Sequence, residues 1–274
     1  MTLKLDGTLL LAGAGNMGSA MLAGWLDRGL DPKQIIVQDP SPPARVSELI
    51  AKHGIDLRAS VTQLSEPPAV LVVAVKPQVM DEVFPPLAQL SDSGTLVLSV
   101  AAGRRIDGFE RHLTKGTPVV RCIPNTPSSI GRGITGAVGN AHVTAAKRAT
   151  CDALLRAIGE VVWLDEEGLI DAVTAVSGSG PAYVFYLAEC LAEAGVKAGL
   201  PPELAQKLAG WTVSGAGELL HRSDLPADVL RQNVTSPNGT TYAALQVLMA
   251  DDGLAKLMRE AVAAATRRSR ELAQ

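Results

Sequence analysis

Residues 9–18 read LLLAGAGNMG, an apolar segment that runs directly into three glycines with the spacing G-x-G-x-x-G. The residues that follow, Ser19 to Ala23, are compatible with a helix, so the stretch predicts a strand, a tight turn and a helix. In such a turn Gly13 allows the sharp bend, Gly15 allows another group to approach the backbone, and Gly18 allows close packing of helix on strand. The stretch therefore predicts the first β-α unit of an α/β fold.

The rest of the first half of the chain repeats this alternation of apolar run and helix-like stretch. Short apolar runs alternate with longer amphipathic stretches up to about residue 165, and the runs are Thr8 to Ala12, Gln34 to Gln38, Ala69 to Val75, Thr95 to Val100, Val119 to Ile123 and Val161 to Leu164. The run from Ala69 to Val75 is apolar at every position, which is typical of a strand covered on both faces in a parallel sheet. With crossover helices over 17–28 and 43–53, the pattern predicts a doubly wound α/β domain.

Beyond about Asp165 the strand-like runs stop and helical periodicity takes over. In the last segment six apolar residues share one helical face, namely Leu254, Leu257, Met258, Ala261, Val262 and Ala265. We therefore expect two domains, an α/β domain over residues 1–165 and an all-α domain over residues 166–274.

The glycine turn between a strand and a helix predicts binding of a dinucleotide, whose pyrophosphate would lie at the helix N-terminus. The alternative is a glycine-rich turn that is only structural. Asp39 ends the second predicted strand about twenty residues after Gly18, where a carboxylate would bind the ribose hydroxyls and repel a 2′-phosphate. That favours NAD, although Ser41 and Arg45 could donate hydrogen bonds to a phosphate. An ordinary turn capped by Asp39 is the remaining alternative.

Two further turns follow strands at the same edge of the predicted sheet. Lys76 and Pro77 come directly after the buried run that ends with Ala74 and Val75, where open α/β sheets bind ligands. A solvated strand end would explain Lys76 equally well, because lysine side chains extend readily from buried strands to water. In the segment 124–127, read PNTP, two prolines fix the backbone around Asn125 where a nicotinamide would lie.

The helical half contains two segments rich in small polar residues. Residues 176–183 read VSGSGPAY, which could admit a cofactor ring or simply allow close packing of helices. Residues 233–241 read NVTSPNGTT and precede an apolar helical segment, so their backbone N–H groups and hydroxyls could bind an anion. A plain helix N-cap is the alternative, but the density of Ser, Thr and Gly exceeds what one cap requires.

Composition excludes several classes of protein. Hydrophobic residues make up 47% and charged residues 19%, which is typical of a folded protein, and a net charge of −3 with 3% aromatic residues does not fit a nucleic-acid binder. The three cysteines and four histidines lack metal-ligand spacing, so we predict no metal site. We find no apolar stretch long enough to span a membrane, and we expect a cytoplasmic protein.

Five motifs together resemble the pyrroline-5-carboxylate reductase family over nearly the whole chain. They read GAGNMG at 13–18, AVKP at 74–77, NTP at 125–127, SGSGPAY at 177–183 and SPNGTT at 236–241. The first is shared by many dehydrogenases, whereas the last two in this order and spacing are specific to the family. The chain departs from the family at Asn238, where Gly is usual, and the family varies at the position of Asp39, which leaves the cofactor choice open.

The resemblance implies reduction of the C=N bond of Δ1-pyrroline-5-carboxylate to L-proline, the last step of proline biosynthesis, with NADPH or NADH as donor. It also implies an N-terminal Rossmann domain and a C-terminal helical domain that forms a homodimer or a higher homo-oligomer of dimers. Backbone N–H groups around Ser236, Gly239 and Thr240 would hold the substrate carboxylate, and Thr241 would hydrogen-bond the ring nitrogen. The candidate cofactor-binding residues are Gly13, Gly15, Asn16, Met17, Gly18, Asp39, Ser41, Ala74, Val75, Lys76, Pro77 and Asn125.

Two other functions remain as alternatives. A β-hydroxyacid dehydrogenase would share the domain order, but its chemistry needs a base, and residues 183–193 contain no Lys in the place where that family has one. A redox sensor that binds NAD(P)H without turnover would not require the predicted anion-binding loop at 236–241.

Overall fold

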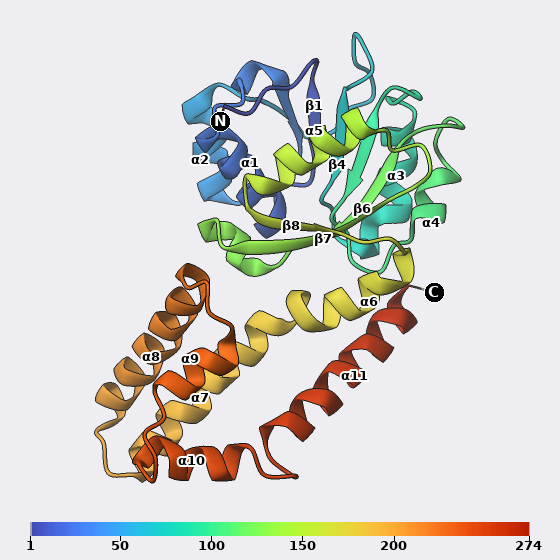
Figure 1. Ribbon diagram of the computed structural model, residues 1–274. Coiled ribbons are helices and arrows are strands. Elements are labelled where there is room, and N and C mark those ends of the chain that lie inside the picture. The colour runs from blue at the N-terminus through green and yellow to red at the C-terminus, as the bar shows by residue number, and fades with distance from the viewer. Residues whose placement is uncertain (1, 274) are drawn as a thin grey trace. The chain divides into compact units, whose positions relative to one another are not determined.

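The computed structural model describes residues 2–273 and divides into two compact units (Figure 1). We call residues 2–178 together with 266–273 the sheet unit, and residues 179–265 the helical unit. Among the described residues, no helix is both long and apolar enough to cross a bilayer.

The sheet unit contains one eight-stranded sheet. Its strands are β1 (Leu9–Ala12), β2 (Ile35–Gln38), β3 (Asp56–Arg58), β4 (Val70–Val73), β5 (Leu96–Ser99), β6 (Val119–Ile123), β7 (Gly133–Gly139) and β8 (Gly159–Trp163). Their spatial order is β3-β2-β1-β4-β5-β6-β7-β8, so the order reverses between β1 and β4, as in a doubly wound fold. The predicted α/β class is confirmed, and the predicted parallel pairing extends from β3 to β6.

The far edge of the sheet differs from the prediction. Strand β7 runs antiparallel to β6, and β8 then pairs parallel with β7. Neither β7 nor the short edge strand β3 was predicted from the pattern. The chain reverses direction through a 3-10 turn, Thr126–Ile130, which sends β7 back alongside β6.

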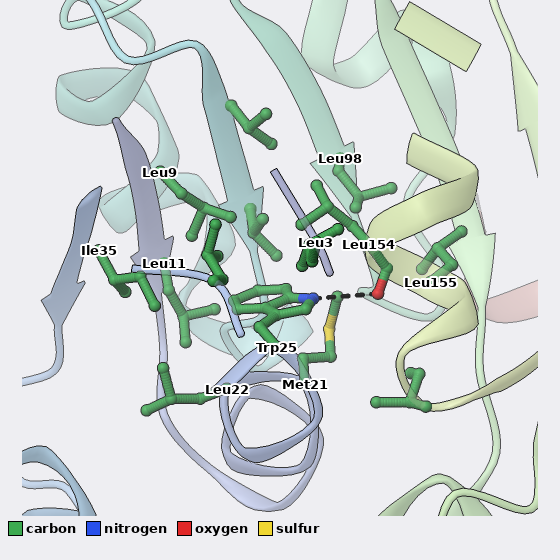
Figure 2. Close-up of a cluster of buried hydrophobic side chains, with 14 of the residues drawn as sticks. Leu3, Leu9, Leu11, Met21, Leu22, Trp25, Ile35, Leu98, Leu154 and Leu155 are labelled. Carbon is green, nitrogen blue, oxygen red and sulfur yellow. Dashed lines mark hydrogen bonds between the residues drawn. The ribbon is translucent and has the colours of Figure 1, made fainter. Parts of the chain in front are cut away.

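Helices cover both faces of the sheet. They are α1 (Asn16–Asp27), α2 (Ala44–His53), α3 (Met80–Ala88), α4 (Ile106–Glu110), α5 (Ala145–Arg156) and α6 (Ile170–Val173). Alternate strand residues enter two separate apolar clusters, one with α1, α2 and α5 and the other with α3, α4 and α6. In the first cluster Trp25 is fully buried, and its Nε1 donates a hydrogen bond of 3.0 Å to the carbonyl of Leu154 (Figure 2). Burial on both faces explains why β4 is apolar at every position.

The contact boundary lies at 178/179, thirteen residues after the change in periodicity at 165/166. Helix α6 and the π-helical turn Thr174–Gly178 are helical in period but pack against the sheet, where Ile170 and Ala175 are fully buried. The end of the chain also belongs to the sheet unit, since Ser269 Oγ donates a hydrogen bond of 2.6 Å to Asp171 Oδ1. Helical periodicity in the sequence identifies a helix, but it does not show against which apolar core that helix packs.

The helical unit is all α, as predicted. Its helices are α7 (Gly180–Lys197), α8 (Pro202–Arg222), α9 (Ala227–Asn233), α10 (Thr240–Leu248) and most of α11 (Leu254–Leu272) (Figure 1). Helices α7 and α8 pack closely at Gly195, where an added Cβ would lie only 3.3 Å from the Cβ of Ala205. Most other side chains of the unit stay exposed, including the largest apolar ones.

Candidate functional site

A cleft of about 520 Å³ opens in the sheet unit at the carboxyl ends of β1, β2 and β4. This is the point where the strand order reverses, and ligands of doubly wound folds bind there. The wall includes six residues predicted from the sequence to bind a cofactor, namely Gly13, Gly15, Asp39, Ala74, Val75 and Lys76. The predicted strand ends therefore meet at one cleft.

The three glycines of the turn have different surroundings. Gly13 has φ +92°, and a Cβ there would lie 2.7 Å from the carbonyl oxygen of Ala74. A Cβ at Gly18 would collide with the carbonyl oxygen of Gly13, so this glycine lets α1 pack against the turn. At Gly15, by contrast, a Cβ would meet nothing within 4 Å. The turn therefore leaves open space at the position where a pyrophosphate would approach.

Helix α1 begins at this open space. Its first turn contains no acidic side chain, and its N-cap Gly15 provides no capping side chain. The first N–H groups of a helix have no acceptor within the helix, and the helix dipole favours negative charge at this end. The geometry thus fits a phosphate group of a dinucleotide. Asn16 is exposed at the start of the helix, whereas Met17 packs partly against the core.

Asp39 follows β2 and binds the glycine turn directly. Its Oδ2 accepts a hydrogen bond of 2.8 Å from the N–H of Ala14, and its Oδ1 accepts one of 2.9 Å from the N–H of Ser41. The carboxylate therefore holds the glycine turn and its own turn together. Each carboxylate oxygen has a second lone-pair site, which leaves acceptors for ribose hydroxyls. Ser41 and Arg45 are exposed beside it.

The other residues that line the cleft were not predicted from the sequence. Gln38 Oε1 accepts a hydrogen bond of 2.8 Å from Val61 N, which fixes the segment 59–62 along the cleft. Apolar residues at the start and on one face of α3 complete the wall, with Val79, Val83 and Leu87 at i, i+4 and i+8. That helical spacing is a signal by which the sequence could have indicated this face.

The Asn125 turn lies elsewhere in the sheet unit, after β6. The Asn125 side chain donates a hydrogen bond of 3.1 Å to the carbonyl of Ser177 and accepts one of 2.9 Å from the N–H of Ile134. The structure therefore brings together two motifs that are far apart in the sequence, the NTP turn and the start of the SGSGPAY segment. Asn125 is nearly buried and holds this junction, while Thr126 beside it is exposed.

The predicted anion-binding loop lies in the helical unit and leads into α10. The N-cap of α10 is Gly239, and no side chain caps the first turn, so the Ser and Thr hydroxyls are not used as a plain N-cap. The N–H of Gly239 closes the loop by donating 3.1 Å to the carbonyl of Ser236. Asn238 has φ +57°, a left-handed conformation that asparagine tolerates better than most residues, which explains how it replaces the usual glycine.

Two family models match the chain. The model described as pyrroline-5-carboxylate reductase dimerisation matches residues 167–272, and the model described as NADP oxidoreductase, coenzyme F420-dependent, matches residues 8–103. The two models cover the helical part of the chain and the first half of the sheet unit respectively.

Relatives and solved structures agree with both models. The chain is 41% identical over 262 residues to a pyrroline-5-carboxylate reductase of Pseudomonas aeruginosa, covering 96% of this chain and 95% of that protein. A pyrroline-5-carboxylate reductase structure from Coxiella burnetii has a TM-score of 0.90 at 34% identity and covers 98% of this chain and 100% of its own. A Plasmodium falciparum structure with NADP bound has a TM-score of 0.82 at 28% identity, covering 98% of this chain and 99% of its own. The chain belongs to the pyrroline-5-carboxylate reductase family.

Proposed function

We propose that the protein reduces the C=N bond of Δ1-pyrroline-5-carboxylate to give L-proline, with NADPH or NADH as hydride donor. The observation behind this proposal is the open space at Gly15 before an uncapped helix, in a chain related over its whole length to pyrroline-5-carboxylate reductases. The reaction is the last step of proline biosynthesis.

The dinucleotide would lie along the carboxyl edge of the sheet. Its pyrophosphate would be held by the backbone of Gly13, Gly15, Asn16, Met17 and Gly18 at the start of α1. Asp39 and Ser41 would contact the ribose, and the turn from Ala74 to Pro77 together with Asn125 would lie on the nicotinamide side. The reduced nicotinamide supplies the hydride.

The substrate carboxylate would bind at the N-terminus of α10. Since the N–H of Gly239 already donates to Ser236, the backbone donors left in the first turn are those of Thr240, Thr241 and Tyr242. Gly239 contributes by its size, because a Cβ there would lie 3.2 Å from the carbonyl oxygen of Ser236. The hydroxyl of Thr241, which is partly buried, would hydrogen-bond the ring nitrogen as that nitrogen gains electron density.

This chemistry needs no nucleophile or metal. An imine carbon is already electrophilic, so the protein has mainly to align two planar rings and to hold the substrate carboxylate in place. Binding groups at a helix N-terminus meet the second requirement.

We further propose that the working form is a homodimer, or a higher assembly of dimers, built by the helical unit. The match of residues 167–272 to a dimerisation model and the exposed apolar side chains of α7, α8 and α10 support this. We place the protein in the cytoplasm, where its three cysteines would stay reduced.

The direct test is to supply the purified protein with Δ1-pyrroline-5-carboxylate and each reduced nicotinamide in turn. We expect loss of nicotinamide absorbance and formation of proline in equal amounts, identified by mass spectrometry. Binding of the cofactor without turnover would instead support a redox sensor. Turnover of a 3-hydroxy acid, without turnover of the imine, would support a β-hydroxyacid dehydrogenase.

A further inference from the structure

Arg104 joins two segments that form one side of the cofactor cleft. It lies in the loop between β5 and α4, and its Nη2 donates hydrogen bonds of 3.2 Å to the carbonyl of Pro77 and 2.8 Å to Asp81 Oδ2. Its Nη1 lies 2.7 Å from Asp81 Oδ1, so the guanidinium makes a bidentate contact with the carboxylate. Pro77 follows Lys76, which lines the cleft, and Asp81 lies in the first turn of α3.

The loop that bears Arg104 is itself held in place on both sides. After it, the N–H of Ile106 donates a hydrogen bond of 2.9 Å to Glu167 Oε1, which also accepts one of 2.7 Å from the buried Arg121. Before it, Gly103 has φ +72°, and a Cβ there would lie 2.9 Å from the carbonyl oxygen of Leu272. Arg104 therefore extends from a fixed base to the turn after β4.

The contact contributes little to folding. The Asp81 side chain is 79% exposed, and ion pairs with such exposure have small effects on stability. The hydrogen bond from Arg104 nevertheless lowers the pKa of the Asp81 carboxyl below its usual range. A polar contact of small energetic value that bridges two parts of a cleft wall has its main effect on geometry.

We propose that Arg104 is a positioning residue for the nicotinamide cofactor, fixing the turn from Ala74 to Val79 against α3 from the neighbouring loop. The inference rests on the proposed function only in so far as this turn contacts the cofactor. A turn held in its bound conformation before binding loses less freedom when the cofactor arrives, so the affinity is higher. The expected effect therefore falls on the cofactor and spares the imine substrate.

The test is the substitution Arg104→Met, which keeps an unbranched side chain and removes all three contacts. We expect the dissociation constants of NADPH and NADH, measured by nicotinamide fluorescence without substrate, to rise about fivefold to tenfold. The KM for the cofactor should rise in parallel, whereas the KM for the imine should stay unchanged. The conservative change Arg104→Lys, which can contact Asp81 or Pro77 but not both in the same way, should restore part of the affinity.

Arg111→Met is the matched control, because Arg111 forms an exposed i,i+4 ion pair with Asp107 at 3.3 Å and does not line the cleft. Both variants should melt within about 3 °C of the wild type. Unchanged cofactor affinity in Arg104→Met, or an equal loss in Arg111→Met, would overturn the proposal. These binding measurements need no turnover, so they stand even if the wild type fails to reduce the imine.

Discussion

The sheet unit and the helical unit place their apolar side chains differently. In the sheet unit β1, β4 and β5 are buried at every residue, and helices cover both faces. In the helical unit none of the eighteen residues of α7 is buried, and α8 buries only Ala205 and Ala209. Trp211 is 74% exposed and Val247 73% exposed. Exposed apolar surface of this extent marks an interaction site, and the dimerisation model supplies the partner, a second copy.

The two units therefore obtain their stability in different ways. The sheet unit has two apolar cores of its own and forms the cleft at the ends of β1, β2 and β4 from its own residues. The helical unit has many apolar residues, but its own helices leave most of them exposed. The first unit should therefore be sensitive to core substitutions, and the second to substitutions that prevent association.

The largest effect is expected in the core of the sheet unit. Trp25→Ala removes a fully buried indole and should lower the free energy of unfolding by about 3 to 5 kcal/mol. The milder change Trp25→Phe removes chiefly the hydrogen bond to Leu154 and should cost about 1 to 3 kcal/mol. Urea denaturation at fixed protein concentration measures both. A loss below about 1 kcal/mol for Trp25→Ala would mean that this core is not the main source of stability.

The next largest effect concerns association of the helical unit. Trp211→Glu introduces a charge into the exposed apolar surface and should raise the dissociation constant of the dimer by more than about a hundredfold. Activity should fall as the dimer dissociates. Leu57→Glu, on the exposed edge strand β3, is the control and should change neither the dissociation constant of the dimer nor the activity. A fully dimeric Trp211→Glu variant would show that α8 faces solvent in the assembly.

A third prediction separates the substrate loop from the cofactor cleft. Thr241→Val keeps the shape of the side chain and removes its hydroxyl, so kcat/KM for the imine should fall about tenfold to a hundredfold. Cofactor affinity should stay the same. Thr240→Val is the control, because only the backbone of Thr240 is assigned a role. If the two variants lose activity equally, the hydroxyl of Thr241 has no special part in the reaction.

The smallest effect is expected at Asp39. Asp39→Asn replaces one acceptor oxygen by a donor that would face a backbone N–H, so the glycine turn loosens and cofactor affinity falls about threefold to tenfold. Removal of the negative charge should also shift the ratio of the kcat/KM values toward NADPH. Asp31→Asn removes a similar carboxylate that accepts from Lys33 N away from the cleft, and it should change neither quantity.

The central strands could be predicted because burial on both faces leaves a continuous apolar run in the sequence. Strand β7 left no such signal, since three of its seven residues are glycines. Packing requires these glycines. A Cβ at Gly136 would lie 2.7 Å from Val173 Cγ1, and one at Gly139 would lie 2.8 Å from Val143 Cγ2. Strand β3 is short, charged and exposed at the edge, where an apolar pattern is not needed.

Prediction of the candidate site has the same limit, because local sequence patterns identify its glycine turn but not its long-range contacts. The glycine turn was predictable because backbone geometry alone dictates its residues, and the structure gives Gly13, Gly15 and Gly18 distinct surroundings. The hydrogen bond from the N–H of Ala14 to the Asp39 carboxylate joins residues 25 positions apart, and the one from Arg104 to the carbonyl of Pro77 joins residues 27 apart. No local sequence pattern records either contact. Such contacts follow from which strand ends lie side by side, which only the folded sheet determines.

The sheet unit forms its apolar cores within one chain, whereas we expect the helical unit to require a second copy. The most direct test is sedimentation of the enzyme through a solution of cofactor and imine, so that turnover is recorded where the active species travels. We expect all reductase activity to migrate with a species of at least two chains, and dilution to monomers to abolish it. Turnover that migrates with the mass of a single chain would show that the helical unit works without a second copy.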